Sequence, residues 1–308
     1  MSNGILQIEY AETAGADWQL VDGCIIEESP LTLYINGQEW VTLMCTPVDQ
    51  AELVLGFLLG EGVITNLEDI ALLDICHHGA VADVWLARSG VKLPHRRVVT
   101  SGCVGGTTFA DKSVITPNLN STRTVEPEQL LELMHQLNQA ATLYRQSRGV
   151  HTSALSDGER LLVVSEDVGR HNTLDKIRGA CLKRAIDPAD QILLTTGRIS
   201  SEMLRKAADM GVPVIVSRTS ATSLSLFLSD LKESGSIEKV IVSRTSATSL
   251  SLQLAREWNI TLVGYAQKRR LRIYADQANR IWLPPAGDNV FVIPMLDRCS
   301  TRLYAMPA

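Results

Sequence analysis

A single cysteine, Cys103, stands in a glycine-rich turn within "VVTSGCVGGTTFAD" at 98–111. Its glycine neighbours let the backbone turn sharply and leave the sulfur unshielded. The thiolate is the reactive form of cysteine, and a helix that begins at "TTFADK" would lower the pKa of this thiol through its N-terminal amides. The pattern is compatible with a working thiol, and also with a cysteine that merely occupies a tight loop.

The chain has six cysteines, widely spaced and without any C-x-x-C pair. That spacing disfavours a disulfide framework and a structural zinc site, so we expect no metal ion held by the protein itself. Cys45 and Cys181 lie in apolar stretches, where burial as small hydrophobic side chains is the usual outcome.

A second candidate site is "SEDVGRHNTLDK" at 165–176. The pattern predicts a strand ending near 165, then a loop that carries Arg170 and His171, and a helix capped by Asn172. A strand, a glycine turn and a helix start form an anion site, because the first amides of the helix are free to bind a ligand. The alternative is a capped helix whose charges are merely solvated.

"TTGRISSEM" at 195–203 repeats this pattern, with Arg198 after Gly197 and a serine as the expected helix cap. Two arginines at neighbouring strand ends are suited to grip two phosphates of one nucleotide-like ligand. "YAQKRRLRIY" at 265–274 is read as one strand and is the only concentrated basic run. It is either a solvated edge strand protected by charge or part of the same anion site.

The elements that must position these residues follow from the wider pattern. "LTLYINGQEWVTLMC" predicts a hairpin turning at Asn36-Gly37. Thr46 is the expected cap of a helix that runs to Gly62, and 127–146 reads as one further helix. Beyond residue 150, strands and helices alternate, which is typical of α/β architecture with a mainly parallel sheet.

One segment is duplicated: "VIVSRTSATSLSL" occurs at 214–226 and again, letter for letter, at 240–252. Two copies are too few for a solenoid, so we interpret them as a local duplication of one strand–turn–helix unit. The added copy forms either an extra β–α unit or a loop, and it is placed to displace "TLVGYAQKRR".

Bulk properties narrow the class of protein. The 308 residues are 45% hydrophobic with a net charge of −5, which favours a globular chain and gives no reason to expect nucleic acid as a partner. The N-terminus lacks a signal peptide pattern, and no run reaches the ~18 apolar residues of a membrane span. We therefore expect a cytoplasmic protein without a membrane partner.

Taken together, these segments resemble the FdhD family of formate dehydrogenase accessory sulfurtransferases. The resemblance runs from "SPLTLYINGQEW" to "YAQKRRLRIYA". It is carried by "LGFLLGEGVI", "SGC", "GVHTSAL", "SEDVGRHNTLDK", "TTGRISSEMLRKAADMGVPVIVS" and "TLVGY".

The resemblance implies a fold similar to that of cytidine deaminases, with a mixed, mainly parallel sheet and a smaller strand-rich N-terminal lobe. It also implies that the protein takes sulfur from a cysteine desulfurase and places it on the bis-molybdopterin guanine dinucleotide cofactor for formate dehydrogenase, acting as a homodimer. The family's sulfur-carrying cysteine matches Cys103, and the guanine dinucleotide phosphates suit Arg170, His171 and Arg198. Its cofactor-binding stretch matches Tyr265, Ala266, Gln267, Lys268, Arg269 and Arg270.

The chain departs from the family pattern in its cysteine loop, because Gly106 stands where many members have a second cysteine. A single-cysteine carrier remains open, and so does a non-catalytic chaperone that only binds the molybdenum cofactor. A zinc deaminase is excluded, because "VHTSA" lacks the required glutamate and no C-x-x-C follows it. We divide the chain into an N-terminal lobe (1–125), a cofactor-binding lobe (126–283) and a C-terminal extension of unknown role (284–308).

Overall fold

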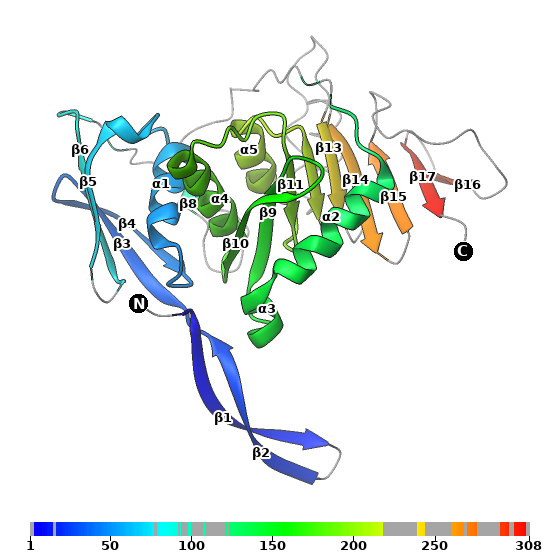
Figure 1. Cartoon of the computed structure of the whole chain (residues 1–308), viewed down its shortest axis with the longest axis horizontal. Helices are drawn as coiled ribbons and strands as arrows, with labels where there is room; N and C mark the ends of the chain where they lie inside the picture. The colour runs from blue at the N-terminus through cyan, green and yellow to red at the C-terminus, as the bar shows by residue number, and fades with distance from the viewer. Residues whose placement is uncertain are drawn as a thin grey trace. The chain divides into compact units, whose positions relative to one another are not determined.

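The computed structural model of the chain separates into two compact units that interleave along the sequence (Figure 1). Unit 1 contains residues 1–109, 141–152 and 166–183, and unit 2 contains 110–140, 153–165 and 184–308. The lobes expected from the sequence are consecutive segments instead, 1–125, 126–283 and 284–308. The structure describes residues 3–14, 17–76, 79–91, 93, 98–99, 107–108, 121, 123–217, 239–243, 260–267, 270–275, 290–295 and 299–305.

Unit 1 is built on a four-stranded sheet with the strand order β4-β3-β6-β5. The predicted hairpin is confirmed: β3 (Ser29–Ile35) and β4 (Gln38–Cys45) pair antiparallel around Asn36 and Gly37. Both turn residues have positive φ angles, 51° and 77°, as a two-residue turn between twisted strands requires. The sheet is completed by β5 (Ile70–Ile75), which follows the short 3-10 helix Leu67–Asp69, and by β6 (Val81–Leu86).

Helix α1 (Gln50–Gly60) packs against this sheet, and its leucines join the buried apolar core of the unit. The helix begins later than the sequence predicted, because Asp49 and not Thr46 is its N-cap residue. Thr46 is fully buried and its hydroxyl accepts a hydrogen bond from the Val168 amide instead. Thr46, which the local sequence predicted as the helix cap, is therefore bonded to a segment more than a hundred residues away.

A separate antiparallel ribbon precedes the sheet and is drawn in dark blue in Figure 1. It consists of β1 (Ile5–Ala14) and β2 (Asp17–Ile26), which pair without a register shift. Two further short strands, β7 (Val98–Val99) and β8 (Thr107–Thr108), pair with each other and precede and follow the Cys103 segment in the sequence.

Unit 2 is built on a nine-stranded sheet with the order β10-β9-β11-β12-β13-β14-β15-β17-β16, in which the ends of β9 and β10 belong to unit 1. The strands β11 to β14 are parallel, and the pairs β9–β11, β14–β15, β15–β17 and β16–β17 are antiparallel. The α/β class with a mixed sheet is thus confirmed. The strands are β9 (His151–Ser156), β10 (Leu161–Asp167), β11 (Ile192–Thr195), β12 (Val214–Ser217), β13 (Lys239–Ser243), β14 (Ile260–Gln267), β15 (Arg270–Ala275), β16 (Val290–Met295) and β17 (Cys299–Ala305).

The helices α2 (Pro127–Ala140), α3 (Thr142–Ser147), α4 (Arg170–Arg184) and α5 (Ser201–Asp209) complete the described elements. The single helix expected at 127–146 is wrong, since it is interrupted at Ala141. In Figure 1, α2 crosses one face of the large sheet, and its leucines share an apolar core with β11 and β12. No helix in the described ranges has the length and apolar character needed to cross a bilayer.

The duplicated segment contributes two strands to the sheet of unit 2. Its first copy supplies β12 and its second copy supplies β13, which pair in parallel with Val214 opposite Val240. The sequence left open whether the added copy forms an extra β–α unit or a loop. Its first residues form an extra strand of the sheet. The remainder of each repeat lies outside the described residues.

Candidate functional site

The chemistry-bearing segment 165–176 is organised around a buried ion pair between Asp167 and Lys176. The Lys176 Nζ lies 2.6 Å from Asp167 Oδ2, and both side chains are almost completely excluded from solvent, at 1% and 0% exposure. The same ammonium donates to the carbonyl oxygens of Glu166, at 3.1 Å, and Thr46, at 3.2 Å. All three donors of the ammonium are thus occupied, which offsets part of the cost of burying it.

The Asp167 carboxylate also caps the start of α4. Its Oδ1 accepts hydrogen bonds from the Gly169 amide, at 2.7 Å, and from the Asn172 side chain, at 2.8 Å. The Asn172 amide group donates in addition to the Met44 carbonyl oxygen. An anion therefore sits at this helix N-terminus, as the sequence suggested, but it is the chain's own carboxylate.

Two of the amides that we expected to be available to a ligand are consequently occupied, those of Val168 and Gly169. The alternative, in which the charges of this segment are merely solvated, is also wrong for the acidic residues. Glu166 and Asp167 are buried and engaged inside the protein. The two side chains act as internal acceptors that tie separate segments of unit 1 together.

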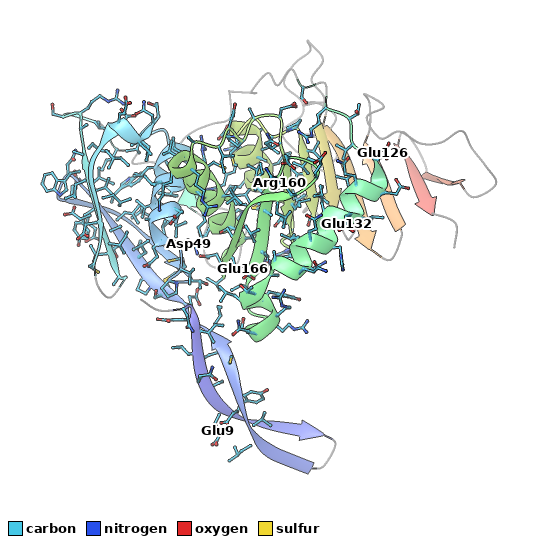
Figure 2. All side chains as sticks on the ribbon, in the orientation of Figure 1. Glu9, Asp49, Glu126, Glu132, Arg160 and Glu166 are labelled. Atoms are coloured by element: carbon cyan, nitrogen blue, oxygen red, sulfur yellow. The ribbon has the colours of Figure 1, made fainter. Side chains whose placement is uncertain are left out.

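Glu166, labelled in Figure 2, is the internal acceptor at the start of the short helix α3. Its carboxylate accepts hydrogen bonds from the amides of Leu143 and Tyr144, at 2.7 and 3.0 Å. It also accepts from the hydroxyls of Thr142 and Thr152, each at 3.0 Å. A carboxylate with four such donors is held in one position, and it fixes α3 to the end of β10.

Arg170 and His171 lie in the first turn of α4 and not in a preceding loop, because β10 extends to Asp167 and the helix begins at Arg170. The predicted cap, Asn172, is inside the helix for the same reason. Both Arg170 and His171 are buried, at 4% and 8% exposure. They belong to unit 1, whereas Arg198 belongs to unit 2.

In unit 2, the end of β11 leads directly into the second predicted arginine site. The Thr195 hydroxyl accepts from the Gly197 amide, and the Ser217 hydroxyl donates to the Gly197 carbonyl oxygen at 2.6 Å. These bonds fix a turn from which Arg198 is exposed to solvent. The expected serine cap is confirmed at Ser200, whose hydroxyl accepts from the Met203 amide at the start of α5.

The strand register places a second group of predicted residues at the same edge of this sheet. Thr195 is opposite Ser217 in the β11–β12 pair, and Ser243 is opposite Gly264 in the β13–β14 pair. Tyr265, Ala266 and Gln267 then continue β14 beyond this edge. The carboxyl ends of parallel strands are where open α/β sheets bind ligands.

The basic run that the sequence analysis assigned to one strand is divided between two strands. β14 ends at Gln267 and β15 begins at Arg270, with Gln267 opposite Arg270 in the antiparallel pair. Lys268 and Arg269 lie between the strands and outside the described residues, as does Cys103.

The cysteines of the described core behave as the sequence predicted. Cys45 and Cys181 are buried. Burial, together with the nearby Asp167 carboxylate, raises the pKa of the Cys45 thiol to about 12. This thiol is therefore held in its unreactive protonated form at neutral pH. Cys24 and Cys76 are partly exposed.

Sequence reasoning missed the roles of Thr46, Asn172 and Lys176. Lys176 lies on a helix that is buried around most of its circumference, so apolar spacing could not identify its inward direction. Its partner carboxylate comes from the preceding strand, and Thr46 comes from the far end of β4. No local sequence pattern indicates that Thr46, Asp167 and Lys176 contact one another.

Comparison with known proteins gives a consistent result. The sequence profile of the FdhD/NarQ family matches residues 26–231 and 237–281. The Sulfur carrier protein FdhD of Staphylococcus haemolyticus (strain JCSC1435) is 39% identical over 210 residues, which cover 67% of this chain and 80% of the relative. The protein of the same name from Staphylococcus aureus (strain MRSA252) is 33% identical over 255 residues, covering 81% of this chain and 86% of the relative.

The fold is shared with a solved structure described as that of a putative formate dehydrogenase accessory protein from Desulfotalea psychrophila. The TM-score is 0.67 at 24% identity, over 91% of this chain and 100% of the other. The sequence match extends across both units, from the sheet of unit 1 to the strands β14 and β15. The chain belongs to the FdhD/NarQ family.

Proposed function

We propose that this protein is a sulfur carrier that serves formate dehydrogenase, with Cys103 as the carrying residue. The observation that supports this proposal most directly is the similarity, at 33–39% identity, to relatives named Sulfur carrier protein FdhD. The character of Cys45 and Cys181 adds to it, because both are buried and Cys45 is kept protonated. Neither is suited to carry sulfur between proteins.

The chemistry requires one thiolate and a sulfur donor. The Cys103 thiolate attacks the outer sulfur of a persulfide on a cysteine desulfurase, forming a new S–S bond as the donor's S–S bond breaks. The donor cysteine leaves as a thiolate, and Cys103 becomes a persulfide. No net oxidation takes place, and Gly106 in place of a second cysteine does not prevent the step.

We further propose that the recipient of this sulfur is the bis-molybdopterin guanine dinucleotide cofactor, bound as a substrate. Arg198, exposed at the end of β11, offers a guanidinium to a phosphate. The stretch from Tyr265 to Arg270 is the second proposed contact: its described part continues β14 at the same edge of the sheet, three strands from β11, with the two duplicated strands between them. Arg170 and His171 are proposed as additional contacts, and the protein is proposed to act as a cytoplasmic homodimer.

The second candidate is a chaperone that binds the cofactor without carrying sulfur. The missing second cysteine favours it, because a persulfide cannot then be passed within a cysteine pair. The two candidates differ in one property, which is whether Cys103 becomes a persulfide.

Intact mass spectrometry tests this property. The purified protein is incubated with a cysteine desulfurase and cysteine, beside the variants Cys103→Ala and Cys24→Ala. Cys24 is the matched control, because its thiol is partly exposed. It lies on the β1–β2 ribbon, where its Sγ donates a hydrogen bond to Gln7 Oε1 at 3.3 Å. We expect a gain of ~32 Da, one sulfur atom, in the wild type and in Cys24→Ala, and no gain in Cys103→Ala.

A gain that survives in Cys103→Ala would refute Cys103 as the carrier. No gain in any of the three proteins, with guanine nucleotide binding retained, would favour the chaperone.

A further inference from the structure

Two strands of identical sequence lie side by side in the sheet of unit 2. β12 and β13 come from the two copies of the repeat, and the first three residues of one copy pair with the same residues of the other. Val214 is opposite Val240, Ile215 opposite Ile241, and Val216 opposite Val242. The connecting segments 218–238 and 244–259 each exceed the dozen or so residues that a parallel crossover needs.

A single strand between β11 and β14 would pair with both of them. Here each copy of the repeat makes one of these two pairings. β12 provides the pairing with β11, and its Ser217 hydroxyl donates to the Gly197 carbonyl oxygen. β13 provides the pairing with β14, where Ser243 is opposite Gly264. Because both copies read "VIVS", one copy contains every residue needed to pair with β11 on one side and with β14 on the other.

The second copy therefore adds width to the sheet without adding a new kind of contact. Neighbouring strands lie about 4.8 Å apart, so the ends of β11 and β14 are separated by three spacings, about 14 Å, where one copy would leave about 10 Å. The end of β11 carries Arg198, and the end of β14 carries Tyr265. The duplication thus separates the two halves of the strand-end site.

We propose that one copy of the 26-residue repeat is an insertion that widens this binding edge and weakens the binding of a guanine nucleotide that spans it. The reach of a guanine nucleotide is limited, so keeping contacts at both Arg198 and Tyr265 becomes more costly when the edge widens by one strand. This inference rests on the proposed cofactor site of the preceding section.

The test is a series of chains with one, two and three copies. Removing residues 218–243 joins Ser217 to Arg244 and leaves one intact copy, and any other 26-residue cut within the repeat gives the same product. Isothermal titration calorimetry with GDP measures binding, and circular dichroism with thermal unfolding checks that each chain is folded. We expect the one-copy chain to bind GDP about tenfold or more tightly than the two-copy chain, and the three-copy chain to bind more weakly still.

Equal affinity across the folded members of the series would overturn the proposal, and so would absence of GDP binding in all of them. If the one-copy chain does not fold, the comparison of two with three copies decides alone. Sulfur loading of Cys103 is measured on the same samples. Persulfide formation with an affinity that does not vary refutes only the widened edge, whereas loss of persulfide formation from every chain refutes the sulfur carrier itself.

Discussion

Asp167 and Lys176 illustrate how a charged motif can serve the fold before it serves a ligand. Burying either charge alone costs several kcal/mol, and the pair is tolerated because each group is saturated with hydrogen bonds. Their partners come from Thr46 just after β4, from the end of β10 and from the start of α4, so one ion pair fixes three segments. The residues around it, Gly169 and Asn172, are required by this geometry.

Lys176→Met provides the test of this role. The variant leaves the Asp167 carboxylate buried without its cation, and we expect a loss of about 3–5 kcal/mol in the free energy of unfolding. Lys183→Met is the matched control, because Lys183 lies on the same helix and pairs with Glu52 at the same distance, 2.6 Å, but is 44% exposed. We expect that variant to lose about 1 kcal/mol or less. Urea unfolding measures both, and similar losses would contradict the structural role of the buried pair.

Arg198 is expected to act on a ligand and not on stability. Arg198→Ala removes an exposed guanidinium at the strand-end edge, so we expect GDP affinity to fall by about 1.5 kcal/mol or more with an unchanged melting temperature. The control is Arg160→Ala, because Arg160 is 80% exposed and adjoins the opposite ends of the strands, near the start of β11. Equal affinity of the Arg198 variant and the wild type in calorimetry would remove Arg198 from the site.

At the scale of elements, α1 and α4 approach closely because each has a glycine at the contact. A Cβ atom added at Gly56 would lie 1.8 Å from the Asp175 carbonyl oxygen, and one at Gly179 would lie 1.9 Å from that of Glu52. Both obstacles are backbone atoms, which cannot turn aside as a side chain does. Any other residue at either position would force the two helices further apart.

Gly56→Ala and Gly179→Ala are therefore expected to lower stability by about 1–3 kcal/mol or more, because the two helices must separate. Gly60→Ala is the control on the same helix, where the nearest atom to an added Cβ is the Arg178 Nη1 at 3.5 Å. There the greater helix propensity of alanine is expected to leave stability unchanged or raise it by up to ~1 kcal/mol. Thermal unfolding distinguishes these outcomes, and a destabilised Gly60→Ala would show that glycine is needed for another reason.

Local sequence predicted those elements whose signals are themselves local. The Asn36-Gly37 turn, the Ser200 cap and the buried strands of unit 2 are confirmed. The start of α1 was missed because Val168 recruits Thr46. Arg170 and His171 were expected in a loop but are buried in the first turn of α4, whereas Arg198 is exposed after β11. The buried surroundings of segment 165–176 were not foreseen, because Asp167 and Lys176 bond to Thr46, more than a hundred residues away.

At the scale of the whole molecule, the interleaving of the two units is the feature that no local pattern contains. Beyond residue 109 the chain belongs to unit 2, except for residues 141–152 and 166–183, which belong to unit 1. Each unit has its own apolar core, one within residues 31–93 and one shared by α2 with β11 and β12. Proteins open locally in cooperative groups of this kind, and separate cores predict separate openings.

Hydrogen exchange measured by mass spectrometry tests this separation with a reciprocal pair of variants. We expect Lys176→Met to raise exchange in β4, α1 and α3, because its ion pair and its neighbour Glu166 hold the segments of unit 1. Leu133→Ala creates a cavity in the other core, at a cost of about 2–5 kcal/mol, and is expected to raise exchange in α2, β11 and β12. If either variant raises exchange equally throughout the described strands, the two units unfold as one, and the interleaved chain has made their cores thermodynamically inseparable.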